Sequence, residues 1–176
     1  FLAAEYPGYG GNAGSPSEEA IFETALANYD WLTRQGIAPE NIIIYGNSLG
    51  SASAVYVAAN RDAGGLILTA PFTSALAMGQ RSMKVLPVSL FMKDKFRSDL
   101  LMANVEEPLL IIHGEEDSNS GTFPIQSERL FGAIKGLGGT ARLVILPLEG
   151  HSYSARESVL HCLWETENWL NVYVSQ

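Results

Sequence analysis

The sequence predicts an α/β fold with a mostly parallel sheet flanked by helices. Short apolar runs alternate along the chain with longer segments of helical periodicity. The apolar runs are rich in Ile, Leu and Val and nearly continuous, which is typical of parallel strands that are covered on both faces. The length of 176 residues and the hydrophobic content of 47% suit a single folded domain, residues 1–176, with a sizeable core.

Five apolar runs are predicted to be strands. The first reads FLAAEY and leads directly into the turn PGYGGNAG, and the second, NIIIYG, leads into a second glycine turn. The remaining three are GLILTA, PLLIIHG and ARLVILP. The predicted strands cover residues 1–6, 41–46, 65–70, 108–114 and 141–147.

Helical patterns fill the intervals between these runs. In the first, Ser15 can cap the helix, Pro16 suits its first turn and Glu18 completes a capping box, while Gly36 and Pro39 end it. Further helices are predicted over residues 51–60, 124–138 and 155–173, and in the last of these Val159, Leu163 and Leu170 are expected on or near the buried side.

Residues 71–107 are less regular and mix methionines, aromatic residues and basic residues. Two interpretations remain open for this segment. It is either a lid over an apolar acyl-binding site, or one broken helix packed on the sheet with surface loops around it.

Composition excludes several classes of protein. The net charge of -8 argues against nucleic-acid binding, which would require a basic patch. No apolar run is long enough to predict a transmembrane helix, and no signal peptide is visible, so the cytoplasm or an organelle interior is expected rather than secretion. The single cysteine, Cys162, excludes an internal disulfide and a cysteine metal cluster. The chain starts in an apolar run without a Met, which suggests a fragment.

The stretch NIIIYGNSLGSASA places Gly-x-Ser-x-Gly between a predicted strand and a predicted helix. This is the context of a nucleophile elbow, in which a tight turn lifts the serine, here Ser48, above the strand end. Gly46 and Gly50 keep the neighbouring positions small. The backbone N–H of Leu49 is then a candidate donor to an oxyanion. The alternative is an ordinary glycine turn.

A serine nucleophile needs a base, and the chain has only three histidines. His113 lies inside an apolar run and suits a core position, and His161 lies within a predicted helix. His151 follows the last predicted strand in a glycine-flanked loop, where a side chain can reach over the edge of the sheet. His151 is therefore the predicted base.

The acid that orients the base is expected after the preceding strand, in HGEED. Asp117 is the predicted acid because it lies furthest into the loop, and Glu115 and Glu116 are the alternatives. The remaining alternative is that all three belong to a solvated charge cluster. The order Ser48, Asp117, His151, with each residue after a different parallel strand, matches that of α/β hydrolases.

Two other patterns are rejected. GYGGNAG follows a predicted strand but lacks a complete G-x-G-x-x-G and a later acidic residue, so it does not indicate dinucleotide binding. HGEED alone does not indicate a metal site. No cofactor is expected.

The chain resembles known families in two pieces. AEYPGYGGNAGSPSEEA, APFTSALAMG and LPVSLFMKDKF resemble the abhydrolase-domain, serine-aminopeptidase-like branch of α/β hydrolases. The tail, about residues 108–170, resembles the catalytic domain of the prolyl oligopeptidase family, in its glutamyl endopeptidase branch. Both resemblances imply a Ser48, Asp117, His151 triad. Ser152 departs from the peptidase pattern, which has Gly after the base.

In members of these families, further strands precede the strand that corresponds to residues 1–6. The loop that usually supplies the second N–H to the oxyanion also precedes that strand. The sequence therefore predicts an α/β-hydrolase fold that lacks the N-terminal strands, with weak catalysis. The first strand is expected either to pair with residues 41–46 or to leave a gap there that another chain fills, giving an oligomer or a complemented sheet.

The functional expectation is a serine hydrolase that acts on small acyl esters or thioesters, with peptides as the alternative substrates. The non-enzymatic alternative is a truncated hydrolase-fold module that binds or completes a partner.

Overall fold

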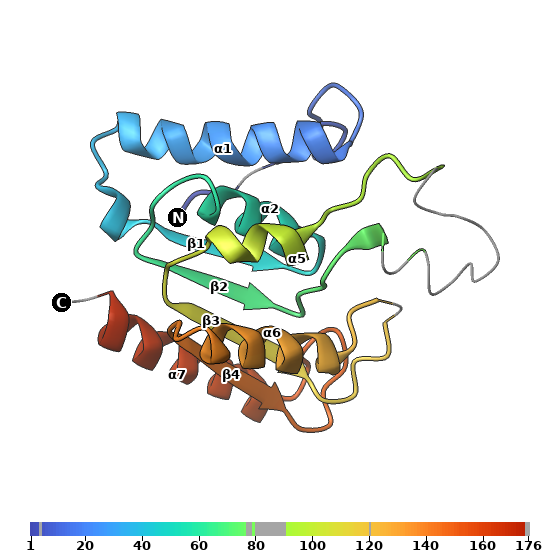
Figure 1. Ribbon diagram of the computed structural model, residues 1–176, viewed down its shortest axis with the longest axis vertical. Coiled ribbons are helices and arrows are strands. Elements are labelled where there is room, and N and C mark those ends of the chain that lie inside the picture. Colours follow the sequence, from blue (N-terminus) through green and yellow to red (C-terminus); the bar gives the residue numbers. More distant parts are fainter. Residues whose placement is uncertain (4, 77–78, 80–90, 120, 175–176) are drawn as a thin grey trace.

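The computed structural model describes residues 1–3, 5–76, 79, 91–119 and 121–174. Four parallel strands form one sheet in the order β1-β2-β3-β4. The strands are β1 (Ile43–Asn47), β2 (Gly65–Thr69), β3 (Leu109–Gly114) and β4 (Ala141–Leu146). All four point the same way, so their carboxyl ends share one edge of the sheet (Figure 1).

Helices cover both faces of this sheet (Figure 1). They are α1 (Glu18–Arg34), α2 (Leu49–Ala58), α5 (Ser98–Leu101), α6 (Pro124–Gly136) and α7 (Arg156–Tyr173), with short 3₁₀ turns η1 (Pro39–Asn41) and η2 (Met102–Asn104). The alternation of strands and helices gives the predicted α/β-hydrolase architecture. Four of the five predicted strands occur, each within two residues of its predicted limits.

The two faces of the sheet carry two separate cores because successive strand residues point in opposite directions. Leu66 and Leu68 pack with the α2 side, together with side chains of α5 and α6. Ile67, between them, packs on the opposite face with Trp169 of α7. The α1 helix packs mainly on α2, through a cluster that includes Tyr29 and Val57 and extends to Ile44 of β1.

The strand predicted over residues 1–6 is wrong for the residues described there, which form neither helix nor strand. Tyr6 of this segment packs against side chains of α1 and α2. The Tyr6 hydroxyl lies 2.6 Å from Ser53 Oγ in α2, and Asn12 donates its side-chain amide to the Glu5 carbonyl at 2.8 Å. Consequently β1 pairs with β2 alone among the described residues.

The predicted start of the first helix is also wrong. The helix begins at Glu18, and Ser17 rather than Ser15 caps it, with Ser17 Oγ accepting the Ala20 N–H at 3.2 Å. Glu18 does not complete a capping box, because its carboxylate accepts the Lys95 N–H at 2.6 Å. A contact distant in sequence therefore replaces the predicted local one.

The last helix has a different buried side from the one predicted. Val159 and Leu163 are exposed, while Glu165 and Trp169 are buried, and Leu170 is partly buried against the sheet. The segment predicted as a lid or broken helix, residues 71–107, is described only in part, because residues 77–78 and 80–90 lie outside the described residues. Among those described, no helix is long and apolar enough to cross a membrane.

Candidate active site

The turn between β1 and α2 places Ser48 at the carboxyl edge of the sheet. Ser48 has φ 49° and ψ -118°, a conformation that non-glycine residues rarely adopt and that costs about 1–3 kcal/mol. The turn is held by the Ser48 N–H, which donates to the Thr69 carbonyl at 2.9 Å, and by Ser51 Oγ, which donates to the Ser48 carbonyl at 2.6 Å. The surrounding structure thus holds a strained serine in place.

Glycine is required at one of the two positions that the sequence motif supplies. A Cβ on Gly46 would lie 2.5 Å from the Gly50 carbonyl oxygen, so the strand and the start of α2 approach too closely for a side chain. A Cβ on Gly50 would meet nothing within 4 Å. The interpretation that both glycines must be small is therefore wrong for Gly50.

The three residues predicted to act together lie in one hydrogen-bonded line. His151 Nε2 lies 2.9 Å from Ser48 Oγ, and His151 Nδ1 lies 2.8 Å from Asp117 Oδ2. Asp117 is a buried acceptor, which places the proton of a neutral His151 on Nδ1 and leaves the Nε2 lone pair facing the Ser48 hydroxyl. This arrangement allows Nε2 to receive a proton from Ser48.

The alternative acids do not reach the base. Glu115 and Glu116 are exposed, and the Glu115 carboxylate accepts the Leu148 N–H at 3.3 Å. The Glu116 N–H donates to the Glu149 carbonyl at 2.8 Å, which joins the loop after β3 to the loop after β4. Both glutamates thus flank the site without contacting His151.

Asp117 accepts four hydrogen bonds through its two carboxylate oxygens. Besides His151, the donors are the Asn119 N–H at 2.9 Å, Thr122 Oγ1 at 3.1 Å and His113 Nε2 at 3.0 Å. Burial raises the pKa of Asp117, but the hydrogen bonds from His151, Asn119 and Thr122 outweigh it, so the pKa lies below its usual value. The carboxylate is therefore ionised at neutral pH.

Sequence reasoning missed Thr122. Its Oγ1 lies 3.2 Å from His151 Nδ1 as well as 3.1 Å from Asp117 Oδ2. A threonine in a loop carries no distinctive spacing, so only the fold brings it to the pair. His113 was expected in the core, and it is fully buried; its contacts with Asp117 could not be read from the strand pattern. His161 is half-exposed and stacks on Trp164.

Leu49 is the first residue of α2, so its N–H has no acceptor within the helix. The start of the helix also carries a partial positive charge. Both features favour negative charge beside Ser48.

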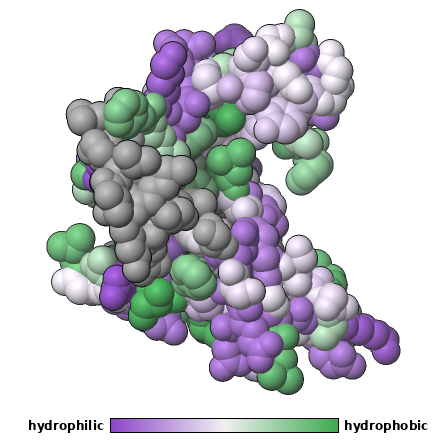
Figure 2. All heavy atoms as spheres, turned by 90° about the vertical axis from the view of Figure 1, so that its right-hand side faces the viewer, coloured by the Kyte–Doolittle hydropathy of each residue, from purple (hydrophilic) through white to green (hydrophobic). Residues whose placement is uncertain are grey.

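The view onto the edge where the strands end shows a hollow on one side, with hydrophobic side chains within it (Figure 2).

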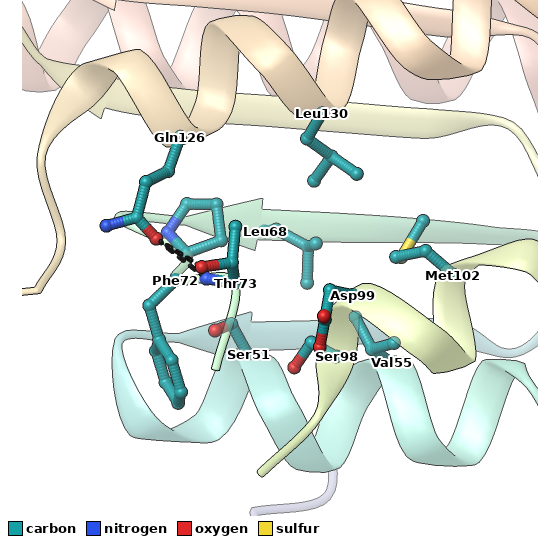
Figure 3. A pocket seen from close by; sticks show the side chains of 11 residues that line it. Ser51, Val55, Leu68, Phe72, Thr73, Ser98, Asp99, Met102, Gln126 and Leu130 are labelled. Carbon is teal, nitrogen blue, oxygen red and sulfur yellow. Dashed lines mark hydrogen bonds between the residues drawn. The ribbon is translucent and has the colours of Figure 1, made fainter. Parts of the chain in front are cut away.

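A small apolar cavity is lined by side chains of α2, α5 and α6 (Figure 3). Its volume is about 30 Å³, and Ser51, Phe72 and Leu130 are among the residues that line it. Two of its lining residues are hydrogen-bonded to each other, because Gln126 Oε1 accepts the Thr73 N–H at 2.7 Å (Figure 3).

A second, larger cavity of about 580 Å³ lies between α1 and residues 93–101. Ser48, Asp117 and His151 line neither this cavity nor the smaller one. Among the described residues, no group of three or more His, Cys, Asp or Glu side chains is arranged to hold a metal ion.

Comparison with known proteins gives a family match over most of the chain. The model of the prolyl oligopeptidase family matches residues 18–176. A protein of rice (Oryza sativa subsp. japonica) named "Probable glutamyl endopeptidase, chloroplastic" is 38% identical over 170 residues, which is 88% of this chain and 17% of the rice protein. Human "Alpha/beta hydrolase domain-containing protein 17B" is 36% identical over 120 residues, covering 66% of this chain and 40% of the human protein.

The fold also resembles that of solved hydrolases. A puromycin-hydrolyzing peptidase of Mycobacterium tuberculosis superposes with a TM-score of 0.72 at 19% identity, over 88% of this chain and 25% of that one. At that identity the likeness shows the α/β-hydrolase fold alone. The chain spans less than half the length of the rice and human relatives.

Proposed function

Because the chain belongs to the prolyl oligopeptidase family, we propose that it carries the reacting groups of a serine hydrolase, with Ser48 as nucleophile, His151 as base and Asp117 as the acid that orients the base. One observation carries the proposal: the hydrogen-bonded line from Ser48 Oγ through both nitrogens of His151 to Asp117 Oδ2. A serine hydroxyl is a weak nucleophile until a base takes its proton, and this line supplies one.

In the proposed reaction Ser48 Oγ attacks the substrate carbonyl carbon while its proton moves to His151 Nε2. The resulting imidazolium donates from Nδ1 to the Asp117 carboxylate, and the Leu49 N–H donates to the oxyanion. When the intermediate collapses, the leaving group takes the proton from Nε2 and an acyl-Ser48 ester remains. A water molecule then attacks the acyl carbon while its proton moves to His151 Nε2. When this second intermediate collapses, Ser48 Oγ takes the proton back and the carboxylic acid product is released.

We favour peptides as substrates. The match to the prolyl oligopeptidase family covers residues 18–176, and the identity to the probable glutamyl endopeptidase extends over 88% of the chain. This moves the preference away from the small esters and thioesters that the front half of the sequence favoured. Esters remain the second substrate class, supported by the similarity to the human α/β hydrolase domain-containing protein.

The test combines a serine-directed probe with turnover. Wild-type protein is expected to react with a fluorophosphonate probe and to cleave members of a panel of peptide anilides and p-nitrophenyl esters. Ser48→Ala should abolish labelling and lower turnover by at least about 10³-fold. Ser15→Ala changes an exposed serine that is not part of the line from Ser48 to Asp117 and should behave as wild type. Labelling retained in Ser48→Ala, or a wild type without either activity, would overturn the proposal.

A second candidate function is association through the edge of β1. Among the described residues β1 has a neighbour on one side only, and Tyr45 on this strand is 57% exposed. Unpaired strand edges are templates for pairing with another chain. Light scattering over a concentration series should show oligomers that a charged residue at this position, Tyr45→Lys, weakens. A monomer at every concentration would contradict it.

A further inference from the structure

The residue of interest is His113, the penultimate residue of β3, which the triad does not include. Its ring is fully buried and both of its nitrogens have partners. Nε2 lies 3.0 Å from Asp117 Oδ2 and 2.5 Å from the Thr122 carbonyl oxygen, and Nδ1 lies 2.7 Å from Ser127 Oγ. The same carboxylate oxygen of Asp117 thus contacts two histidines, His151 and His113.

These contacts assign the protons of His113. The Thr122 carbonyl can only accept, and the ionised Asp117 carboxylate can only accept, so Nε2 must be the donor to both. In a neutral imidazole Nδ1 is then an acceptor, and the Ser127 hydroxyl is free to donate to it. Ser127, in α6, is itself fully buried and therefore fixed.

The charge state matters as much as the tautomer. Burial lowers the pKa of His113 below its ordinary value, which outweighs the hydrogen bonds to Thr122 and Asp117. Among the described residues, the titratable groups that act on its ring are Asp117 and His151. A neutral His113 gives Asp117 a hydrogen bond without adding a positive charge.

We propose that His113 is a positioning residue for the hydrolase reaction: its Nε2–H holds the Asp117 carboxylate toward His151, and the Ser127 hydroxyl keeps the proton of His113 on Nε2. The proposal rests on the function proposed above. A charged histidine at this position would compete with the His151 imidazolium for the Asp117 charge. A neutral donor fixes the carboxylate and leaves its charge available to the imidazolium that forms during catalysis.

The first test needs no activity. Long-range ¹H–¹⁵N NMR of the histidine rings should show His113 as the neutral Nε2–H tautomer at neutral pH. A charged ring, or a neutral ring protonated on Nδ1, would overturn the proposal. Because this measurement reads the ring itself, it decides the inference even if wild-type protein fails the turnover test, which would count only against the proposed function.

The second test uses two substitutions at one position. His113→Leu removes the donor, and His113→Gln keeps an N–H near the place of Nε2. We expect kcat to fall about 10- to 100-fold in His113→Leu with KM little changed, since one hydrogen bond to a charged group is lost. His113→Gln should recover most of that loss. Equal kcat in the wild type and a folded His113→Leu, or equal loss in both variants, would contradict a positioning role.

The pH profile separates positioning from simple destabilisation. When the His113 donor is removed, the Asp117 carboxylate accepts more strongly from its remaining donors, which include His151 Nδ1. The protonated form of His151 is then favoured more than in the wild type. The acid limb of kcat should therefore move to higher pH in His113→Leu and return toward the wild type in His113→Gln. A limb that stays in place, or moves to lower pH, overturns the proposal.

A variant outside the carboxylate cluster covers the case in which His113→Leu does not fold. Ser127→Ala removes the donor to Nδ1 without touching Asp117. It should populate the Nδ1–H tautomer of His113 in the NMR spectrum and lower kcat about 3- to 10-fold. A mixed tautomer with unchanged kcat would show that His113 does not position Asp117.

Discussion

Gly46 and Ala54 approach each other so closely that a Cβ on Gly46 would lie 2.6 Å from the Cβ of Ala54. Backbone atoms of Gly50 and Ser51 also lie within 2.7 Å of that position, so no single side-chain movement can make room. Gly46→Ala must therefore displace α2 from β1. We expect a loss of about 2 kcal/mol or more in the free energy of unfolding, measured by urea denaturation.

The matched control is the other glycine of the motif. Gly50→Ala places its methyl group in open space within α2. Alanine is the better helix former by about 0.5–1 kcal/mol, so this variant should be as stable as the wild type or slightly more stable. Equal destabilisation by the two substitutions would show that the motif's glycines are required for another reason than space.

A second prediction concerns the acid. Asp117→Asn preserves the shape of the side chain but presents an amide N–H or an uncharged oxygen to His151 Nδ1, which disfavours the tautomer that can accept the Ser48 proton. By the behaviour of catalytic aspartates in serine hydrolases, kcat should fall roughly 10³- to 10⁴-fold.

Glu115→Gln and Glu116→Gln are the controls for that substitution, because both glutamates are exposed neighbours of Asp117 in the same loop. Each should change kcat by less than about 3-fold, as expected for surface positions. A larger loss in either glutamate variant than in Asp117→Asn would assign the acid differently.

The sheet, and the placement of Ser48, Asp117 and His151 together at one edge of it, could be predicted from the sequence because both depend on local pattern. Buried parallel strands read as continuous apolar runs, and Ser48, Asp117 and His151 each follow such a run. Long-range contacts were not predictable. Ser17 rather than Ser15 caps α1, and Glu18 contacts Asp94 and Lys95, which lie 76 and 77 residues away in the sequence.

The last helix shows a second limit. It carries apolar side chains around much of its circumference, including exposed Leu160, Leu163 and Trp164, so its periodicity did not identify the side that meets the sheet. The fold decides through Trp169, whose ring lies against Gly65 of β2, where a Cβ would come within 2.4 Å of it. Which face of α7 is buried therefore depends on a glycine more than 100 residues away.

The third prediction concerns the loop that carries His151. Glu149 is buried, and its carboxylate accepts the Ser154 N–H at 3.0 Å and the Ala155 N–H at 2.9 Å, at the start of α7. These hydrogen bonds, with one from Ser158, hold the pKa of Glu149 below its usual value. The carboxylate of Glu149 thus joins the start of the loop 149–155 to its end.

The sign of the pH dependence follows from that lowered pKa. In the unfolded chain a glutamate has a pKa of about 4.3. The stabilisation by Glu149 is therefore fully present above that pH, and it is lost as the pH falls through the pKa of Glu149 in the folded protein. Glu149→Gln should therefore lower the melting temperature at pH 7, with a difference that shrinks below about pH 4. Glu116→Gln should show no such trend. A difference that is independent of pH would show that charge is not the cause.

The fourth prediction concerns the ion pair between β4 and α7. Arg142 Nε and Nη2 each donate to one oxygen of the buried Glu165 carboxylate at 2.5 Å. The hydrogen bonds from Arg142 are the main reason that the pKa of Glu165 lies below its usual value. Arg142→Met keeps much of the stem but removes both donors to the carboxylate, beside which His161 Nε2 lies 3.5 Å away.

We expect Arg142→Met to lose about 1–3 kcal/mol of unfolding free energy at pH 7, less than for a fully buried pair because the Arg142 side chain is 46% exposed. The double variant Arg142→Met with Glu165→Leu should recover much of that loss, since the buried charge is then gone as well and an apolar contact replaces the pair. Urea denaturation of the four proteins completes a double-mutant cycle. If the losses of the two single variants simply add in the double variant, the interaction between Arg142 and Glu165 does not contribute to stability.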